Sequence, residues 1–225
     1  MANRPIFIPT TEHKELFKEE SIEFKFYNGF SITQKAKSID SLHASAKQLG
    51  FHHILEVSTK SSSELGHKLS AFNLMIHTKK YGDISIESAF QGSKVFEDGG
   101  SYHDIYELDS LSAKRDKRLK NSGALKVFSF EDVTWELEPK SAFYDWIYIK
   151  ALYQNIDFIE DKLLTYDAFT DIEFNPKKSI NCQARSCAIL VSLIKQNKLK
   201  EAMKNPKSFR TTVYKKTYKQ LVFEF

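Results

Sequence analysis

Residues 85–96 constrain the fold of this chain more than any other stretch, because a helical pattern and three reactive side chains coincide there. Read as a helix, the stretch places Glu87, Gln91 and Lys94 at positions i, i+4 and i+7, on one face. The apolar residues between them are left to pack against the protein. The stretch therefore predicts a central helix that presents an acid or base, a hydrogen-bonding amide and a nucleophilic amine together.

Both ends of this predicted helix carry their own signals. Ser85 or Asp83 can cap the first turn, because a side-chain oxygen accepts a free backbone N–H. Residues 98–100, Asp-Gly-Gly, indicate the end, since glycine tolerates a left-handed exit. Spacing alone favours another interpretation, in which Glu87 and Lys94 are solvated surface charges worth less than ~1 kcal/mol as a pair.

The composition indicates a folded globular protein with a mildly basic surface. Hydrophobic residues make up 41% and aromatic residues 13% of the 225 residues, which excludes a disordered chain and suits one domain with an appended arm. Most of the 18 Phe and 10 Tyr are expected in the core, but such rings also stack on bases. The net charge of +4 permits contact with a polyanion without establishing it.

The cysteines and the apolar segments of the sequence indicate the cellular compartment of the protein. Cys182 and Cys187 are five residues apart in a predicted helix, which suits neither a zinc site nor a disulfide framework and predicts buried thiols in a reducing compartment. We find no signal peptide and no apolar run long enough to span a membrane. The sequence therefore predicts a cytoplasmic protein that contacts no membrane, and it indicates no metal and no cofactor.

The first quarter of the chain predicts strands followed by a helix. Residues 5–33 alternate as strands do, with Ile22, Phe24 and Phe26 on one face. Residues 34–50 have helical spacing, and residues 51–57 suggest another strand. Residues 58–64 form a polar run that we interpret as a solvated loop, with a hydroxyl-rich phosphate cradle as the alternative.

The rest of the chain predicts mainly helices and polar segments. A charge run at residues 113–120 is either a solvated helix face or an anion-binding patch led by Arg115. A basic, Tyr-rich tail at residues 204–219 either holds a nucleic-acid backbone or is a solvated hairpin, and it ends in a strand at 221–225. A short extended segment at 106–110 precedes the charge run. Between the run and the tail lie a strand at 127–130, an aromatic helix at 135–153, a helix at 158–166, an irregular acidic loop at 168–176 and an amphipathic helix at 181–196.

Four motifs in order resemble the NADAR superfamily, the YbiA-like N-glycosidases. The E-x-x-x-Q-x-x-K pattern from Glu87 to Lys94 is similar to the family's signature helix, and residues 69–73, Leu-Ser-Ala-Phe-Asn, resemble its L-S-N-F segment, with Ala71 where members usually have Asn. The helix around Trp146 and residues 181–185 resemble two later segments. The resemblance covers roughly residues 65–195 and is closest to the branch found as the antitoxin beside DarT-type DNA ADP-ribosyltransferases.

The resemblance implies an α+β fold, a single compact and mainly helical domain with a small sheet and an N-terminal strand extension. We expect the extension at residues 1–50, the catalytic domain at 51–200 and a basic tail or strand at 201–225. The implied activity is an N-glycosidase that removes ADP-ribose from the amino group of guanine in DNA and releases ADP-ribose. The protein then acts as antitoxin to a DarT-type toxin, a partner in function whether or not the two bind.

The resemblance also implies roles for particular residues. Lys94 is expected to form a Schiff base with the ribose, with Glu87 as general acid or base. Asp171 is the candidate second carboxylate, and Glu173 in the same segment remains open. The residues expected to bind ADP-ribose are Ser70, Phe72, Asn73, Gln91, Arg115, Trp146, Asn181 and Gln183.

Two other functions stay open at this point. One is an N-glycosidase for a small phosphorylated metabolite of the riboflavin pathway, although such an enzyme needs neither the N-terminal extension nor the basic tail. The other is a non-catalytic module that binds nucleic acid or blocks a toxin by direct contact, which the basic surface allows.

Overall fold

The structure is a computed structural model that describes residues 1–12, 15–29 and 31–214. The chain forms two compact units: unit 1 comprises Met1–Ser70 and Ile156–Lys204, and unit 2 comprises Ala71–Asn155 and Asn205–Phe225. More residues are helical than are in strands and the sheets are small, so the predicted α+β class is confirmed. No helix among the described residues is long and apolar enough to cross a membrane.

Unit 1 is built on one mixed sheet of four strands. Their order is β2-β1-β10-β3, in which β1 pairs antiparallel with both β2 and β10 whereas β10 and β3 are parallel. Ile22 and Phe24 are 2% and 0% exposed on the same face, as the alternating pattern predicts. The strands are β1 (Ala2–Pro9), β2 (Phe17–Phe24), β3 (Ile54–Glu56) and β10 (Ala168–Thr170).

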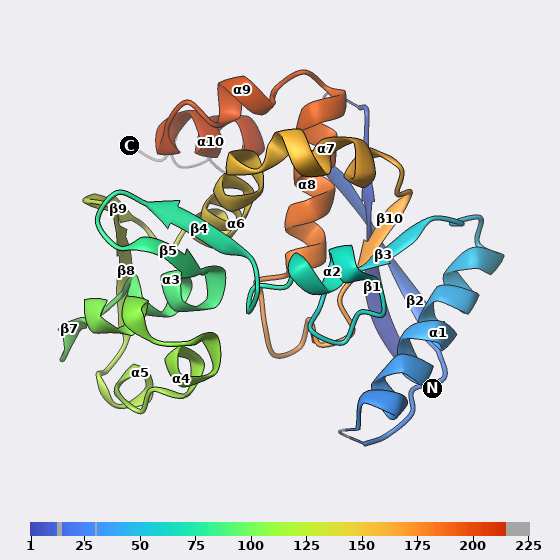
Figure 1. Cartoon of the computed structure of the whole chain (residues 1–225), viewed down its shortest axis with the longest axis horizontal. Helices are drawn as coiled ribbons and strands as arrows, with labels where there is room; N and C mark the ends of the chain where they lie inside the picture. Colours follow the sequence, from blue (N-terminus) through green and yellow to red (C-terminus); the bar gives the residue numbers. More distant parts are fainter. Residues whose placement is uncertain (13–14, 30, 215–225) are drawn as a thin grey trace, which may run out of the picture. The chain divides into compact units, whose positions relative to one another are not determined.

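Two long helices, α1 (Ile32–Gln48) and α8 (Gln183–Lys195), cover opposite sides of this sheet (Figure 1). Leu42 of α1 packs into a cluster with Ile6 and Phe24, while α8 contacts β1 and β10. Helix α1 begins at a Ser31 cap and ends before Gly50, whose φ of +96° suits glycine. The remaining helices of unit 1 are α2 (Glu64–Lys68), α7 (Ile156–Leu164) and α9 (Leu199–Ala202).

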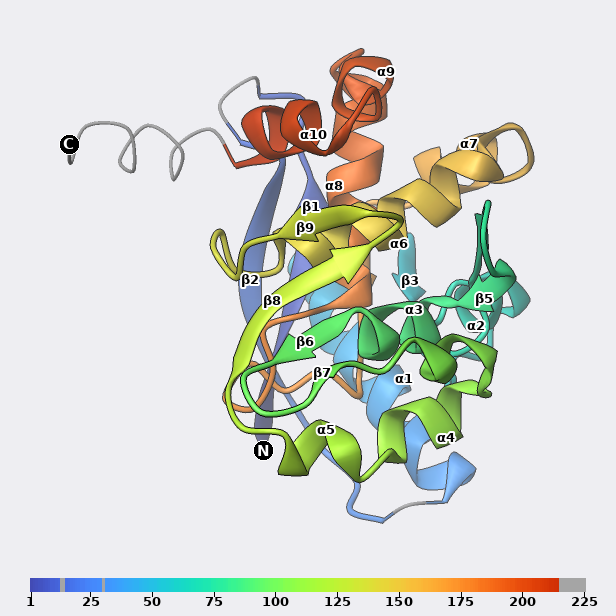
Figure 2. The same ribbon diagram turned by 90° about the vertical axis from the view of Figure 1, so that its left-hand side faces the viewer.

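Unit 2 combines a hairpin, a second sheet and helices. Its sheet has the order β7-β6-β8-β9, and Figure 2 shows these strands side by side. The hairpin is β4 (Met75–Thr78) with β5 (Gly82–Ser85), and the sheet strands are β6 (Lys94–Phe96), β7 (Gly100–Ser101), β8 (Leu125–Phe130) and β9 (Val133–Trp135). The helices are α3 (Ile86–Gly92), the 3₁₀ helix η1 (His103–Glu107), α4 (Ser110–Arg115), α5 (Arg118–Asn121), α6 (Ala142–Gln154) and α10 (Pro206–Val213).

Helix α6 is the core element of unit 2, because ten of its residues are buried. Tyr148 is fully buried, and Trp146 packs with its ring centroid 5.3 Å from that of Phe209 in α10. Phe143 stacks on Phe128 of β8 at 4.6 Å. Among the described residues, 11 Phe and Tyr side chains are buried and the others are half-buried or exposed, so the prediction that most of them lie in the core is met only in part.

Four sequence predictions are wrong in part. The aromatic helix does not begin at residue 135, because Trp135 pairs with Phe128 in a β-hairpin and the helix starts only after Pro139. The acidic segment 168–176 is not irregular throughout, since its first three residues form β10 between two partner strands. Residues 106–110 are extended only at Leu108 and Asp109, which connect the end of η1 to the start of α4.

The fourth correction concerns the central helix. It ends at Gly92, with Ser93 as its C-terminal cap, and not at residues 98–100. Lys94 belongs to β6 and pairs there with Phe128. The strand predicted at 221–225 lies outside the described residues, as does the tail from residue 215 onward.

Candidate functional site

Helix α3 places two of the three polar residues of the central stretch. Ser85 caps it, since its Oγ accepts the Ser88 N–H at 3.1 Å. The exit from α3 is close to Tyr106, because a β-carbon added at Gly92 would lie 2.6 Å from that ring. A side chain at Gly92 would therefore clash with Tyr106, and after the Ser93 cap the chain continues as strand β6 from Lys94.

Glu87, Gln91 and Lys94 form a continuous hydrogen-bonded chain within unit 2. The Gln91 Nε2 donates to Glu87 Oε1 at 2.8 Å, and the Lys94 Nζ donates to Gln91 Oε1 at 2.7 Å. Glu87 and Gln91 are only 9% and 8% exposed. The interpretation of these residues as solvated surface charges is therefore wrong, and the structure brings together the three polar residues of the central stretch.

Burial and two opposing charges set the electrostatics of Lys94. Burial lowers the pKa of Lys94, because a charged ammonium loses hydration there. The Glu87 carboxylate raises this pKa, and the ammonium of Lys114 lowers it. The Lys94 Nζ also lies 4.9 Å from the centre of the Phe90 ring. Burial therefore favours the free amine, which is the form in which a lysine can act as a nucleophile.

The Phe72 segment is fixed next to the start of α3. The Glu87 N–H donates to the Ala71 carbonyl at 2.9 Å, and the Ser110 Oγ donates to the Phe72 carbonyl at 2.8 Å. The Lys114 Nζ lies 5.0 Å from the centre of the Phe72 ring. Phe72 and Lys114 thus lie near the hydrogen-bonded residues Glu87, Gln91 and Lys94. Sequence reasoning missed Lys114, because it singled out the neighbouring Arg115.

The other predicted ligand residues of unit 2 lie in different surroundings. Asn73 is exposed directly after Phe72, and Arg115 is exposed in the last turn of α4. Trp146 is 6% exposed and packs against core rings. These positions leave the role of each as a prediction.

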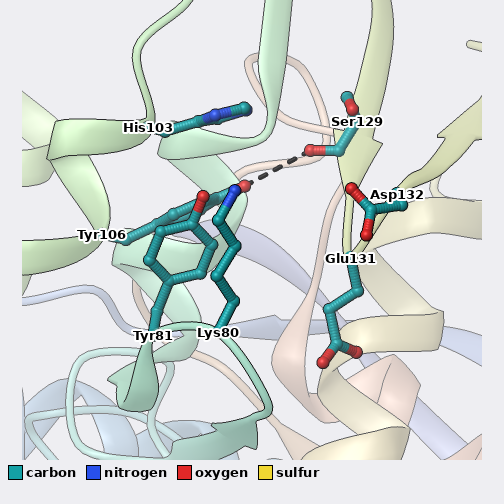
Figure 3. A pocket seen from close by; sticks show the side chains of 7 residues that line it. All are labelled: Lys80, Tyr81, His103, Tyr106, Ser129, Glu131 and Asp132. Atoms are coloured by element: carbon teal, nitrogen blue, oxygen red, sulfur yellow. Dashed lines mark hydrogen bonds between the residues drawn. The ribbon is translucent and has the colours of Figure 1, made fainter.

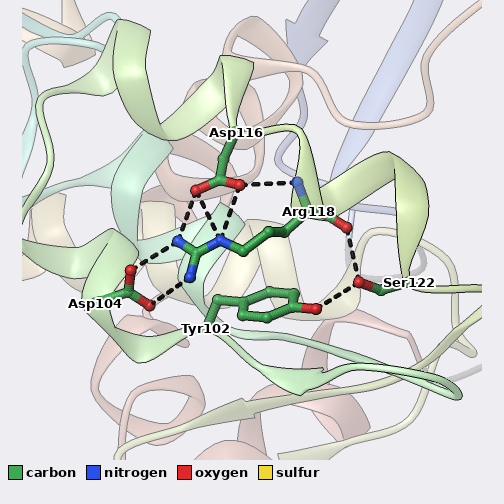
Figure 4. Close-up of polar contacts among 5 residues, drawn as sticks. All are labelled: Tyr102, Asp104, Asp116, Arg118 and Ser122. Carbon is green, nitrogen blue, oxygen red and sulfur yellow. Dashed lines mark hydrogen bonds and ion pairs between the residues drawn. The ribbon is translucent and has the colours of Figure 1, made fainter.

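The charge run at residues 113–120 is partly neutralised by Asp116 within the run and by Asp104 of η1 (Figure 4). The Arg118 guanidinium pairs with Asp104 and Asp116, each at 2.7 Å, and lies 4.5 Å from the centre of the Tyr102 ring. The Tyr102 hydroxyl in turn hydrogen-bonds to Ser122. Arg118 therefore ties η1 to α5 and is committed to structure rather than to an anion.

Unit 1 contains the other predicted carboxylate, Asp171, at the end of β10. Its Oδ1 accepts the Glu173 and Phe174 N–H groups at 3.0 and 3.1 Å, and its Oδ2 accepts Gln183 Nε2 at 2.9 Å. Burial raises the pKa of Asp171 to about 6. Glu173 is instead exposed and lies 3.5 Å from the ammonium of Lys35.

The remaining predicted residues of unit 1 differ in exposure. Gln183 is the first residue of α8 and holds Asp171, whereas Asn181 is half-buried in the segment before that helix. Ser70 is buried, and its Oγ donates to the His67 carbonyl at 2.8 Å.

Sequence reasoning also missed Glu56, a buried carboxylate of unit 1. It is 3% exposed at the end of β3 and accepts hydrogen bonds from Ser58, Thr170 and the Ile172 N–H. Burial and the charge of Asp171 raise the pKa of Glu56 to about 7. The available signal was a lone glutamate within an apolar strand sequence.

A small pocket in unit 2 contains none of the predicted site residues. Figure 3 shows its aromatic rings, with Tyr81 and Tyr106 centroids 4.5 Å apart and the Tyr106 hydroxyl donating to the Ser129 carbonyl at 3.3 Å. Within the described residues, no group of three or more His, Cys, Asp or Glu side chains is placed to hold a metal ion. The pocket is lined by Lys80, Tyr81, His103, Tyr106, Ser129, Glu131 and Asp132.

A half-buried lysine that is hydrogen-bonded to an amide next to a carboxylate is the kind of site used by enzymes that act through a covalent intermediate. A family model for DarT1-associated NADAR antitoxins matches residues 2–221, so the chain belongs to that family. The resemblance seen in the sequence is thereby confirmed. The curated proteins contain no match to this chain. Membership supports an antitoxin role linked to DarT1 and points to N-glycosidase or hydrolase chemistry in general.

Proposed function

We propose that this protein hydrolyses the N-glycosidic bond between ADP-ribose and the amino group of guanine in DNA, and so reverses the damage done by its DarT-type toxin. The observation that carries the proposal is the Lys94 amine, half-buried with a lowered pKa and hydrogen-bonded at 2.7 Å to Gln91. Guanine, ADP-ribose and the toxin follow from the family resemblance.

In the proposed reaction, the bond from C1 to the guanine nitrogen is replaced by a bond from C1 to the lysine nitrogen, and water then hydrolyses that second bond. The ribosyl ring opens, the Lys94 amine attacks C1, and the bond from C1 to the guanine nitrogen breaks as that nitrogen receives a proton. Water then adds to the lysine imine, which releases the amine and the aldehyde form of ADP-ribose. Glu87 is the proposed proton donor and acceptor, and one water is consumed in all.

The ligand groups of unit 2 supply complementary contacts. The Phe72 ring offers an aromatic face, and Lys114 offers a cation for a diphosphate close to Lys94. Gln91 holds the amine and is proposed to contact the ribose, while Arg115 remains a proposed phosphate contact. Asp171 in unit 1 is the proposed second carboxylate, to be tested by Asp171→Asn.

The first experiment compares oligonucleotides ADP-ribosylated on guanine and on thymine. Wild type is expected to release ADP-ribose from guanine only, and borohydride is expected to trap the covalent imine. Lys94→Arg keeps the charge but cannot form an imine with C1, so it should neither trap nor turn over. Lys126→Ala, at an exposed lysine of β8, is the matched control and should behave as wild type.

Other results point to other functions. Turnover without trapping, retained in Lys94→Arg, would reassign Lys94 to electrostatic stabilisation. No release from either oligonucleotide, with release from a phosphorylated N-riboside metabolite, would favour the small-molecule enzyme. Toxin neutralisation retained in folded Glu87→Ala would favour an antitoxin that blocks its toxin by contact.

A further inference from the structure

In unit 1 three side chains form a hydrogen-bonded chain that runs from α1 into the sheet. The His43 Nε2 lies 2.8 Å from Thr170 Oγ1, and that hydroxyl lies 2.7 Å from Glu56 Oε2. Thr170 and Glu56 are direct partners on the parallel strands β10 and β3. The backbone pairing therefore holds the hydroxyl opposite the carboxyl, and this alignment does not depend on a flexible loop.

Glu56 is also linked to the segment that contains Asp171. Its Oε1 accepts the Ile172 N–H at 2.9 Å, directly after Asp171, and the Ser58 hydroxyl at 2.6 Å. The charge of Asp171 adds to burial in raising the pKa of Glu56 to about 7, while that of Asp171 is raised to about 6. A proton bound by one carboxyl thus affects the ionisation of the other.

The same heavy atoms accommodate two arrangements of protons. Burial lowers the pKa of His43 to about 4, so the ring is neutral near pH 7 and either nitrogen can carry the proton. With Glu56 ionised, Nε2–H donates to Thr170 and the hydroxyl donates to Glu56. With Glu56 protonated, its O–H donates to Thr170 and the hydroxyl donates to an unprotonated Nε2.

We propose that His43, Thr170 and Glu56 form a proton relay that resets the ionisation of Asp171. Protonation from outside proceeds in three linked transfers: Nδ1 of His43 takes a proton from solvent, Nε2 passes its proton to Thr170, and Thr170 passes its own to Glu56. In all, the N–H bond of His43 moves from Nε2 to Nδ1, the Thr170 hydroxyl exchanges its proton, and one O–H bond forms on Glu56. One proton enters from solvent and no bond between heavy atoms changes. The assignment to Asp171 rests on the proposed function, in which that residue is an acid or base.

Other charged groups surround the relay without being members of it. On α1, the charge of Asp40 raises and that of Lys47 lowers the pKa of His43. Around Asp171, Arg4 of β1 and Cys182 both sense its charge. The charge of Glu173, which pairs with Lys35, raises the pKa of Asp171.

The relay is tested directly by nitrogen NMR of the full chain with labelled histidine between pH 5 and 9. The His43 Nε2 signal is expected to change from an acceptor to a donor shift as Glu56 ionises near pH 7. Thr170→Val keeps the side-chain shape but removes the hydroxyl, and should abolish this change. Ser58→Ala removes a Glu56 hydrogen bond outside the relay and should retain the change with a moved midpoint.

A His43 signal that is constant with pH in wild type, or a change that survives in Thr170→Val, would overturn the relay. This readout requires no activity, so it remains decisive even if the protein fails to hydrolyse ADP-ribosylguanine.

A kinetic experiment tests the link to Asp171. In Thr170→Val the rate of ADP-ribose release is expected to fall roughly tenfold with a displaced pH profile, less than the loss of an acid–base group itself. Thr170→Ser should restore both rate and profile. An unchanged profile in Thr170→Val, in an active enzyme, would overturn the assignment to Asp171.

Discussion

The Lys94 ammonium donates to Gln91 Oε1 over 2.7 Å although the two residues belong to different elements, the strand β6 and the helix α3. The helix holds Gln91 against Glu87, one turn earlier, and the sheet fixes the backbone of Lys94. The hydrogen bond to Gln91 and the backbone pairing of β6 therefore both hold the amine in place. Its protonation should therefore respond to nearby charges in a predictable direction.

The pKa of Lys94 should move in opposite directions in two variants. In Glu87→Gln it falls further, because the carboxylate that favours the ammonium is gone, whereas in Lys114→Gln it rises, because a repelling cation is gone. The measurement is the pH dependence of Lys94 modification by an amine reagent, followed by peptide mass spectrometry. Shifts of the same sign would contradict this prediction.

Gly66→Ala should strongly destabilise the protein. An added β-carbon would lie 2.0 Å from the Glu56 carbonyl oxygen and 2.5 Å from Ser61 Oγ, so the backbone itself must move. We expect a loss of about 3 kcal/mol or more in the free energy of unfolding, measured by urea denaturation.

Gly82→Ala is the matched control for that clash. Gly82 has a φ of +66° with open space at the β-carbon position, so only backbone strain of about 1–2 kcal/mol is expected. Equal losses in the two variants would show that the predicted clash at Gly66 is relieved elsewhere.

Arg118 and Arg115 should have separable roles. Arg118→Ala removes the pairing with Asp104 and Asp116 and should lower the free energy of unfolding by about 0.5–1 kcal/mol, in the range of exposed ion pairs. Arg115→Ala should leave thermal unfolding unchanged but weaken ADP-ribose binding, measured by calorimetry. The reverse pattern would assign the anion contact to Arg118.

The stability of the wild type should fall as pH rises from about 4 to about 7. The folded protein retains the Glu56 proton up to a pKa of about 7 and the Asp171 proton up to about 6, whereas their ordinary values are 4.5 and 3.8. His43, with its pKa lowered from 6.5 to about 4, offsets part of this difference, because the unfolded state binds the extra histidine proton. On balance the two carboxyls leave the folded state with more bound protons in this window, so each unit rise in pH lowers the free energy of unfolding.

Glu56→Gln removes one of these protons and keeps a carboxamide that can both donate and accept. This variant should make the decrease of stability with rising pH smaller, and it should raise the free energy of unfolding at pH 8 by on the order of 1–3 kcal/mol. The check is chemical denaturation of both proteins at pH 5 and pH 8. A parallel decline in both would mean that Glu56 does not titrate in this range.

Much of the local structure is predictable from local pattern. The spacing of Ile39, Leu42 and Ala46 indicates α1, and the alternation of Ile22 and Phe24 indicates a strand with one buried face. The Ser85 cap and the pairing of Glu87 with Gln91 also follow from spacing along one helix. These features depend on residues only a few positions apart.

The errors arise where distant segments override local pattern. Residues after Gly92 continue a helical spacing, but pairing with β8 makes them a strand. Residues 168–170 look like part of a polar loop, yet they pair with β1 on one side and β3 on the other. Trp135 is likewise in a strand, because it pairs with Phe128 across a hairpin and does not join the helix that begins after it.

The sequence by itself determined the family, the α+β class and the identity of the Glu87, Gln91 and Lys94 constellation, because these are encoded in short spacings. Only the tertiary structure decided that Lys94 is half-buried beside Lys114, and that Glu56 meets Thr170 across a separation of 114 residues. The physical reason is that burial and electrostatic environment depend on which segments surround a side chain, and sheet pairing and helix packing set those neighbours.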